Sequence, residues 1–424
     1  MNSLNLNVSG LPKSATLAIN ERSAKLQREG RTIYKFGLGQ SPFPVPSVVQ
    51  EELKKNVHQK AYLDVEGLPE LREAVARFFG RQHGANYRGD QVLVGPGSKE
   101  LMFLLQLVYY GDLVIPTPSW VSYAPQAHII GRQVKWLPAR AEDNWLLHPE
   151  DLEALCQKDP DRPRIVILNY PSNPTGATFS EDELREIARI ARKFDLVILS
   201  DEIYSQLHHD GQHISIAQFY PEGTIISGGL SKWCGAGGWR LGTFLFPEAY
   251  FKLKDTMAVA ASETFTSTSA PIQYAAVAAY QQNPELTEYL NQARHILKLL
   301  ARHIVGQLNA ANIKVPLPAG GFYLFPSFSY HTEALAQRSV TNSEALCEYL
   351  LKKTGVATLP ASAFGCHSSG LSLRMAYVDF DGEKAMNNYH RLTSGEMDEQ
   401  TYLNTYCPNV VEGIDRLVEE VKNW

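Results

Sequence analysis

The sequence predicts an α/β fold in which a large domain, built on a mostly parallel seven-stranded sheet, is joined to a smaller α+β domain. Between residues 90 and 245, short apolar runs alternate with amphipathic segments. Such alternation is typical of parallel strands joined by helices that cover both faces of a sheet. After residue 284 the pattern changes to a long helical stretch followed by short mixed elements. The 424 residues are 44% hydrophobic and 20% charged, which supplies a large core and excludes a disordered chain.

Seven short apolar runs predict the strands of the large sheet. They are Gln91–Val94, Leu113–Ile115, Val134–Leu137, Ile165–Leu168, Leu196–Leu199, Thr224–Ile226 and Gly242–Phe246. Between them, Glu150–Cys156 and Glu181–Lys193 are expected to be helices, because apolar residues recur in the second at helical spacing. Ser180 precedes Glu183 by three residues, which predicts a capping box. Ligands of such sheets bind beyond the carboxyl ends of the strands.

The remaining elements predict a second, smaller lobe. One helix is expected from about Pro284 to Ala311 as a bridge between the lobes, and a later one at Ser343–Lys353. The prolines of SPFPVP (residues 41–46) mark a crossing of the chain between them. The expected division is a large domain over 46–300 and a small domain over 1–45 and 301–424, with a polar insertion at about 387–408.

Composition narrows the classes of partner and compartment. Lys and Arg number 40 against 45 Asp and Glu, a net charge of −5 with both signs mixed, so neither nucleic acid nor a membrane is expected as a partner. No apolar stretch reaches the ~18 residues of a spanning helix, and no signal peptide is readable. Five cysteines without a CxxC pair favour a reducing, cytoplasmic location. We expect His208, His209 and His213 to lie in a solvated loop, and we expect no metal site.

Two motifs after predicted strands carry polar groups suited to a ligand. In VGPGSKE, Gly95 and Gly97 permit a tight turn, and Ser98 opens a helix whose N–H groups are suited to a phosphate. When this motif stands alone, an ordinary capped helix is the better explanation. In NYPSNPTG, the rigid Asn-Pro-Thr-Gly turn aims the Asn173 amide at a ligand, unless the turn is purely structural.

Two further motifs carry the reactive groups. In SDEIY, Asp201 follows four apolar residues, so its carboxylate needs a cationic or N–H partner unless it caps the next helix; Tyr204 is close enough to share the site. In SGGLSKWCGAGGWRLG, Lys232 is surrounded by small residues, and a lysine in such a crevice becomes a nucleophile suited to a Schiff base. A solvated loop lysine is the alternative. Arg240 offers a planar fork for a phosphate.

Taken in order, these motifs resemble those of a known family. NPTG, SDEIY, SK…GWRLG, PAGGFY and SLRMAY occur in the order found in class I/II aminotransferases, the fold-type I pyridoxal 5′-phosphate (PLP) enzymes related to aspartate aminotransferase, over about residues 30 to 385. The resemblance implies PLP as cofactor and amino-acid and 2-oxo-acid substrates. It further implies aspartate, aromatic or alanine-type donors, 2-oxoglutarate as acceptor, ping-pong turnover and a homodimer.

The resemblance also implies a role for individual residues. Lys232 would form the Schiff base and carry the proton, Asp201 would pair with the protonated ring nitrogen, and Tyr204 and Asn173 would hydrogen-bond the ring oxygen. Trp120 would stack on the ring and border the substrate. The implied phosphate ligands are Gly97, Ser98, the Lys99 backbone, Ser231 and Arg240, with Tyr62 reaching the phosphate of the partner subunit.

For the substrate, the resemblance implies that Arg374 and Gly39 bind the α-carboxylate, together with Asn173. Proximity to the motifs suggests an aromatic-tolerant side-chain pocket formed by Tyr34, Phe36, Tyr123 and Tyr204. Two alternatives stay open at this point. One is a PLP-dependent β-lyase of the cysteine-conjugate or cystathionine type, and the other is a catalytically silent PLP-binding scaffold.

Overall fold

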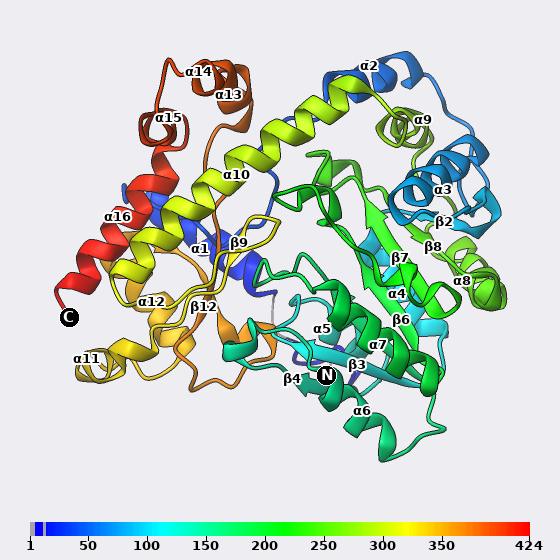
Figure 1. Ribbon diagram of the computed structural model, residues 1–424, viewed down its shortest axis with the longest axis horizontal. Helices are drawn as coiled ribbons and strands as arrows, with labels where there is room; N and C mark the ends of the chain where they lie inside the picture. Colours follow the sequence, from blue (N-terminus) through cyan, green and yellow to red (C-terminus); the bar gives the residue numbers. More distant parts are fainter. Residues whose placement is uncertain (1–4, 12–13) are drawn as a thin grey trace.

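The computed structural model describes residues 5–11 and 14–424 and contains the expected seven-stranded sheet (Figure 1). Its strands are β2 (Val92–Gly95), β3 (Asp112–Thr117), β4 (Val134–Pro138), β5 (Arg164–Asn169), β6 (Val197–Asp201), β7 (Thr224–Gly229) and β8 (Gly242–Leu245). Their order is β2-β8-β7-β6-β5-β3-β4, with β8 antiparallel to both neighbours and the other pairs parallel. The predicted fold class is confirmed, and each predicted run forms one strand.

Both faces of the sheet are buried, which explains the continuous apolar runs. Ile165 and Ile167 of β5 pack toward α4 (Ser98–Val108) and α8 (Phe251–Ser262). Val166 and Leu168 point the other way, toward α6 (Pro149–Gln157) and α7 (Glu181–Lys193). Successive residues of a strand face opposite sides of the sheet. A strand that is covered by helices on both sides therefore has no regularly alternating polar residues. The predicted capping box is present, because Ser180 accepts from the Glu183 N–H and Glu183 accepts from the Ser180 N–H.

The parallel strands end together at one edge of the sheet. Asn169, the last residue of β5, lies opposite Asp201, the last residue of β6, and Asp201 in turn lies opposite Ser227 of β7. The chain leaving β7 leads directly to Lys232. The motifs after these strands are therefore gathered at the edge where ligands of parallel sheets bind.

A long helix connects this sheet to the C-terminal elements. Helix α10 (Pro284–Ala310) crosses the molecule and packs against α13 (Gly382–Asn387), α15 (Glu399–Tyr406) and α16 (Pro408–Lys422) (Figure 1). Beyond α10 lie α11 (Thr332–Gln337), α12 (Ser343–Thr354) and a three-stranded antiparallel sheet in the order β11 (Leu359–Pro360), β12 (Leu373–Ala376), β9 (Tyr323–Leu324).

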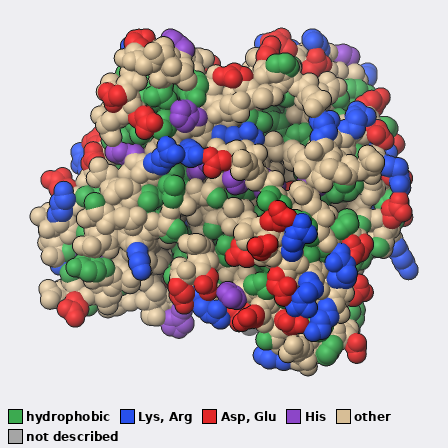
Figure 2. Space-filling view, in the orientation of Figure 1, with side chains coloured by type: hydrophobic (Ala, Val, Ile, Leu, Met, Phe, Trp, Pro, Cys, Tyr) green, Lys and Arg blue, Asp and Glu red, His purple; other side chains and the backbone are tan. Residues whose placement is uncertain are grey.

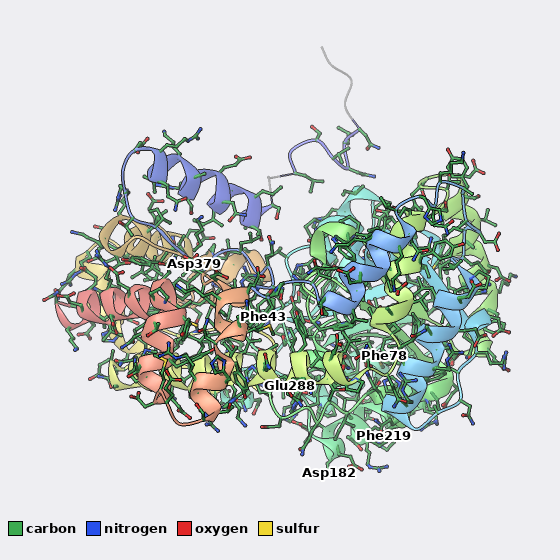
Figure 3. The ribbon with its side chains drawn as sticks, turned by 90° about the horizontal axis from the view of Figure 1, so that it is seen from above. Phe43, Phe78, Asp182, Phe219, Glu288 and Asp379 are labelled. Atoms are coloured by element: carbon green, nitrogen blue, oxygen red, sulfur yellow. The ribbon has the colours of Figure 1, made fainter. Side chains whose placement is uncertain are left out.

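The N-terminal segment joins the C-terminal elements. Strand β1 (Tyr34–Lys35) pairs in parallel with β10 (Val356–Ala357), and α1 (Ala15–Arg28) packs on the same region through Ile19 and Leu26. Phe43, from the SPFPVP crossing, lies between the two halves of the molecule, with Asp379 on one side and Phe78 on the other (Figure 3). Residues 1–4 and 12–13 of the expected small domain lie outside the described residues.

The segment 387–408 is more ordered than its polar sequence suggested. It contains α14 (Tyr389–Thr393) and α15, and buries Tyr402, Leu403 and Tyr406 against neighbouring helices. The Tyr402 hydroxyl donates to the carbonyl of Ala385 at 2.6 Å, and the Tyr389 hydroxyl meets Nδ1 of His295 on α10 at 2.6 Å. The segment is therefore polar on its outer side, while one face of α15 is apolar and packs inward.

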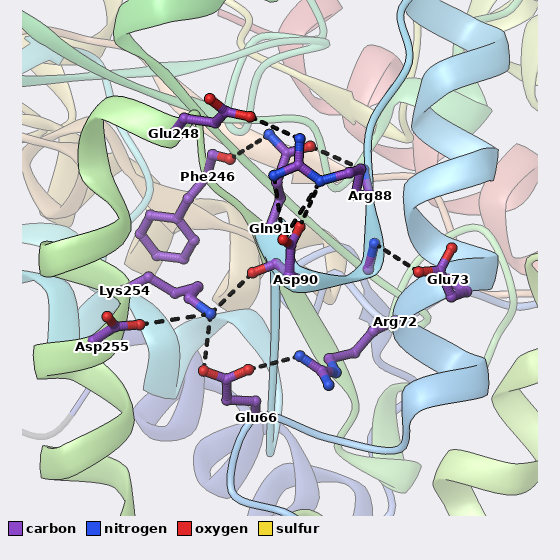
Figure 4. A network of polar contacts seen from close by, with 11 residues as sticks. Glu66, Arg72, Glu73, Arg88, Asp90, Gln91, Phe246, Glu248, Lys254 and Asp255 are labelled. Carbon is purple, nitrogen blue, oxygen red and sulfur yellow. Dashed lines mark hydrogen bonds and ion pairs between the residues drawn. The ribbon is translucent and has the colours of Figure 1, made fainter.

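A polar network fixes the loop between α2 (Ser47–Asn56) and α3 (Pro69–His83) (Figure 4). The Lys254 amine, whose side chain is only 6% exposed, donates to Oε1 of Glu66 at 2.8 Å and to the carbonyl of Asp90 at 2.9 Å. Arg72 donates to the other Glu66 oxygen at 2.6 Å. These bonds brace the loop that carries Tyr62.

The surface shows no broad face of one charge in the view of Figure 2, where acidic and basic side chains are intermixed. Among the helices of the described residues, none combines the length and apolarity that crossing a membrane requires.

Candidate active site

A cavity of about 600 Å³ opens at the carboxyl ends of the parallel strands. Many of the residues that the sequence singled out line it: Gly39, Ser98, Lys99, Trp120, Asn173, Asp201, Tyr204, Ser231, Lys232 and Arg240. They come from six separate stretches of the chain, so the fold alone brings them together. Gly97 and Arg374 lie against residues of this cavity, whereas Tyr62 does not line it.

Lys232 points its amine into the cavity. Nζ donates to the carbonyl oxygen of Gly39 at 2.6 Å and lies 5.8 Å from the ring centroids of Tyr204 and Phe322. It lies in the loop after β7, and its half-buried side chain lines the cavity. A lysine placed in this way is accessible to an aldehyde.

Asp201 places a carboxylate at the floor of the cavity and is 3% exposed. The Tyr123 hydroxyl donates to its Oδ2 at 2.5 Å, and the N–H of Ile203 donates to its Oδ1 at 3.4 Å. Burial raises the pKa of Asp201 to about 6, against the effect of these hydrogen bonds and of the Lys232 charge. A buried carboxylate of this kind is suited to a protonated ring nitrogen as its partner.

The turn after β5 holds the Asn173 side chain in place. Oδ1 of Asn169 accepts from the Asn173 N–H at 2.8 Å, while the Asn169 amide donates to the carbonyl of Asp201 at 3.0 Å. The two strand ends are thereby tied to each other, and Asn173 faces both the cavity and Arg374.

A cationic cradle is built where α4 begins. Gly97 has φ +94°, and a Cβ there would lie 2.1 Å from the Arg240 guanidinium; a Cβ at Gly242 would lie 2.0 Å from the Ser98 nitrogen. Only backbone therefore fits between the helix N-terminus and Arg240. The Arg240 guanidinium donates to the carbonyls of Gly237 and Pro96, at 2.9 and 3.2 Å. Free helical N–H groups beside a guanidinium form a site for a phosphate.

Lys99 adds a third cation to the same cavity. Its Nζ lies 4.9 Å from the ring centroid of Trp120. Burial, followed by the charges of Arg240 and Lys232, lowers the pKa of Lys99. The electrostatics of the cavity therefore favour an anionic ligand.

Arg374, on β12, offers a second place for an anion. It is 2% exposed, donates from NH1 to Oδ1 of Asn173 at 3.3 Å and from NH2 to the carbonyl of Gly37, and lies over the rings of Tyr323 and Phe364. Its Nε has no hydrogen-bond partner, and it pairs with no carboxylate within residues 5–11 and 14–424. A buried guanidinium with a donor left over is suited to a carboxylate from outside the chain.

Comparison with known proteins decides the family. Residues 31–384 match the family model for aminotransferases of class I and II. An aspartate aminotransferase of Geobacillus stearothermophilus is 32% identical over 396 residues, covering 91% of this chain and 97% of that protein. A probable aspartate/prephenate aminotransferase of Aquifex aeolicus is 31% identical over 381 residues, covering 88% and 93%. The aspartate aminotransferase of Thermus thermophilus, solved with maleate, is similar with a TM-score of 0.84 at 26% identity, over 99% of this chain and 100% of that one.

The chain belongs to the class I and II aminotransferase family. It is a PLP-dependent enzyme that moves an amino group between an amino acid and a 2-oxo acid. The relatives named above are all aminotransferases, so they lend no support to the β-lyase and silent-scaffold alternatives. The cavity of this aminotransferase fits PLP, because a lysine amine, a buried carboxylate and a glycine-lined cationic cradle border one space.

Two tyrosines of the aminotransferase site have roles that the sequence did not reveal. Tyr123 had been assigned to a side-chain pocket, but its hydroxyl binds Asp201. Tyr323, in the PAGGFY motif, had no assigned role, yet its hydroxyl lies 2.8 Å from that of Tyr204. It also crowds Gly39, where a Cβ would lie 1.9 Å from the Tyr323 oxygen. The motif itself was the available signal, since its paired glycines admit an aromatic ring beside the cavity.

Two expectations about aromatic and histidine residues were wrong. Tyr34 and Phe36 are 1% and 0% exposed and belong to the core, so they form no part of the cavity. His208 and His209 are buried, and the His213 side chain is only 7% exposed. The three histidines are therefore not solvated, although Asp210, Gly211 and Gln212 between them are exposed, because His209 bonds to the backbone of Ala319 and Gly321 and His213 faces Glu202.

Glu202 explains the burial of His213. Its carboxylate is fully buried behind Asp201, with Nε2 of His83 at 3.4 Å and Nε2 of His213 at 3.2 Å. Burial raises the pKa of this carboxyl, but the two histidines outweigh burial and hold it below its usual range. No group of side chains in the described residues has the arrangement of a metal site.

Proposed function

We propose that this aminotransferase carries out both half-reactions at the cavity around Lys232, with Asp201 beneath the cofactor ring and Arg374 binding the substrate. The observation that carries the proposal is the convergence of the Lys232 amine and the buried Asp201 carboxylate on one cavity, at whose border Arg374 keeps an unpartnered donor. When bound, PLP supplies an electron sink for the electron pair released at the substrate α-carbon.

The chain has a group for each part of the cofactor. Asp201 would hold the protonated ring nitrogen, while Tyr204 and Asn173 would bind the ring oxygen, and Trp120 would cover the ring face. The cradle residues would bind the phosphate: Gly97, Ser98, the Lys99 backbone, Ser231 and Arg240. This placement agrees with the charges, because the charge of Arg240 lowers the pKa of Lys99, which puts two cations near the proposed phosphate position.

Lys232 is proposed as the proton carrier. Among the described residues its amine donates only to a neutral carbonyl, that of Gly39, so it can exchange this hydrogen bond for one to a reacting atom. The amine takes the proton from the substrate α-carbon and returns it on the cofactor side, which is general acid–base work for one positioned group.

Arg374, Asn173 and Gly39 are proposed to bind the α-carboxylate. Arg374 already donates to Asn173, and its free Nε would complete a fork toward a carboxylate. Because Arg374 is on β12 and Lys232 follows β7, a substrate that engages both bridges the proposed domains 46–300 and 301–424. Binding across the two favours closure, which excludes water from the reacting carbon.

For the donor we propose L-aspartate, with 2-oxoglutarate as acceptor, ahead of aromatic or alanine-type donors. Relatives at 31–32% identity are named for aspartate. Lys99 supports a dicarboxylic substrate, because its amine lies in the cavity and forms no ion pair within the described residues.

The five free cysteines, four of them buried, support a reducing cytoplasmic location.

We further propose a homodimer in which Tyr62 reaches the phosphate of the partner's cofactor. Tyr62 is 88% exposed, an unusual position for a large aromatic side chain, and its loop is braced by the buried Lys254–Glu66 ion pair. A braced loop that presents an exposed phenol is suited to an intersubunit contact.

The proposal is tested by half-transamination. The PLP-loaded protein is mixed with one amino acid at a time, and the absorbance of the bound cofactor is followed. A shift with L-aspartate, reversed by 2-oxoglutarate, is expected. If the absorbance of the bound cofactor responds to no amino acid, the proposed transamination is contradicted. If a β-substituted substrate releases pyruvate and ammonia without a 2-oxo-acid acceptor, the β-lyase alternative is favoured. Lys232→Ala should abolish the shift, whereas exposed Lys55→Ala should retain it.

A further inference from the structure

The hydroxyls of Tyr204 and Tyr323 form a buried pair at the junction of two parts of the chain. Their oxygens are 2.8 Å apart, their rings pack edge to face with centroids 5.5 Å apart, and the residues are 3% and 1% exposed. Tyr204 follows β6 of the large sheet, and Tyr323 begins β9 of the three-stranded sheet. The contact therefore joins the cofactor side of the cavity to the part that carries Arg374.

The surroundings decide how the two protons are placed. Charged or titratable groups face the pair from every side: Asp201 from β6, Tyr123 from α5 (Tyr123–Ile129), Lys232 from the loop after β7 and Arg374 from β12. Burial, followed by the interaction with Tyr323, raises the pKa of Tyr204 well above its usual value, so Tyr204 keeps its proton. One must then donate to the other.

The acceptors available to each hydroxyl differ. Tyr323 has Tyr204 at 2.8 Å and the carbonyl of Gly39 at 3.5 Å, and that carbonyl already accepts from Lys232 at 2.6 Å. The short bond to Tyr204 is therefore the better one for the Tyr323 proton. If Tyr204 donates to the cofactor ring oxygen, as the proposed function requires, its own oxygen is left to accept from Tyr323.

We propose that Tyr323 is a positioning residue that donates its hydroxyl proton to Tyr204 and so directs the Tyr204 proton to the cofactor ring oxygen. Donors in series polarise one another, so Tyr204 becomes a stronger donor than it would be alone. The ring oxygen is then stabilised in its anionic form. The pH midpoint of the absorbance change of the bound cofactor is therefore lower than it would be without the Tyr323 hydroxyl.

The same residue connects this effect to the substrate. The Arg374 guanidinium lies 4.7 Å from the centroid of the Tyr323 ring, and the Tyr323 hydroxyl is next to Gly39. A carboxylate that binds Arg374 and the Gly39 backbone contacts both neighbours of Tyr323. Its arrival shifts the Tyr323 hydroxyl between Tyr204 and Gly39, so the cofactor side responds to an occupied carboxylate site.

The experiment is a pH titration of bound-cofactor absorbance in the wild type and in Tyr323→Phe, which keeps the ring under Arg374 and deletes only the hydroxyl. We expect the midpoint to rise by about half a unit to one unit. A double-mutant cycle with Tyr204→Phe isolates the contact, because Tyr323→Phe should add little once the Tyr204 hydroxyl is gone. A carboxylate inhibitor should move the wild-type midpoint more than that of Tyr323→Phe.

Tyr377→Phe is the matched control, since Tyr377 is a buried phenol of the same region whose hydroxyl donates to the carbonyl of Gly321 at 3.3 Å. Its midpoint should equal that of the wild type. An unchanged or lowered midpoint in Tyr323→Phe would overturn the inference, and so would a variant that no longer folds, because the hydroxyl would then serve stability. A wild type that binds no cofactor would instead overturn the proposed function.

Discussion

Arg374 and Asn173 share a hydrogen bond, from NH1 to Oδ1 over 3.3 Å, that joins β12 to the turn after β5. Neither residue would meet the other without the long α10 connection, since they are 201 positions apart. The pair presents one guanidinium and one amide to the same space. The proposed α-carboxylate site therefore takes one residue from the three-stranded sheet and one from the edge of the seven-stranded sheet.

Replacing Lys232 tests the proton carrier. Lys232→Ala should lower kcat by roughly three orders of magnitude or more, because no other amine donates to the Gly39 carbonyl within the described residues. Steady-state kinetics and thermal unfolding measure the effect. Lys55→Ala is the control, and a K232A enzyme with more than a tenth of the wild-type kcat would refute the assignment.

Arg374→Lys tests carboxylate binding. A lysine keeps the charge but loses the planar fork, so kcat/KM for the amino acid should fall about 100-fold, mainly through KM. Cofactor affinity should stay the same, since Arg374 is not part of the phosphate cradle. Arg338→Lys, at a half-buried arginine outside the cavity whose side chain donates to the carbonyls of Ala334 and Asn423, serves as control. Equal loss of cofactor affinity would point to a general distortion instead.

Asp201→Asn should separate stability from activity. Burial raises the pKa of Asp201 to about 6, so folding favours the protonated form and stability declines as pH rises from about 4 to 6. Above pH 6 the cofactor-free wild type carries the full cost of a buried charge, on the order of 2 kcal/mol. Asp201→Asn has no charge to bury, so the variant should be more stable than the wild type above pH 6. It should nevertheless lose activity.

Urea unfolding of the cofactor-free proteins at pH 4 and pH 8 measures this difference. The gain of Asp201→Asn over the wild type should be near zero at pH 4 and complete at pH 8. Exposed Asp161→Asn should show no such dependence on pH. A gain that is the same at both pH values would mean that Asp201 does not titrate in this range.

Tyr62→Phe tests the intersubunit contact. If the phenol donates to the partner's phosphate, its loss should raise the Kd for PLP about tenfold. The Kd follows from fluorescence or absorbance titration of cofactor-free protein, with exposed Tyr110→Phe as control. An identical Kd, or an enzyme that is fully active as a monomer, would remove Tyr62 from the site.

The sequence was a good guide where the physical signal is local. The continuous apolar runs predicted all seven strands, and the small residues around Lys232 indicated a lysine with access to a cavity. The capping box of Ser180 and Glu183 placed the start of α7 correctly. Helix α15 was missed although Asp398 caps it by accepting from the Thr401 N–H, a signal of the same local kind.

The predictions that were wrong or missing concern residues whose surroundings are set by contacts with distant parts of the chain. Tyr34 is close to Gly39 in sequence, but β1 pairs with β10 and turns it into the core. His213 looks solvated in HHDGQH, yet its side chain turns inward to Glu202, and the neighbouring His209 is buried against the carbonyl of Gly321 in PAGGFY. Tyr323 gained its role only through Tyr204, 119 positions away.

The crowding at Gly39 restricts how this enzyme can be altered. Any side chain at this position would collide with the Tyr323 oxygen, and the next ring atom is only 2.6 Å from the same point. Removing the hydroxyl is therefore not enough to make room, and a smaller residue at 323 would take away one of the two rings, Tyr323 and Phe364, that the Arg374 guanidinium packs against. Attempts to broaden the range of accepted amino acids should leave these two positions untouched and vary other parts of the cavity wall.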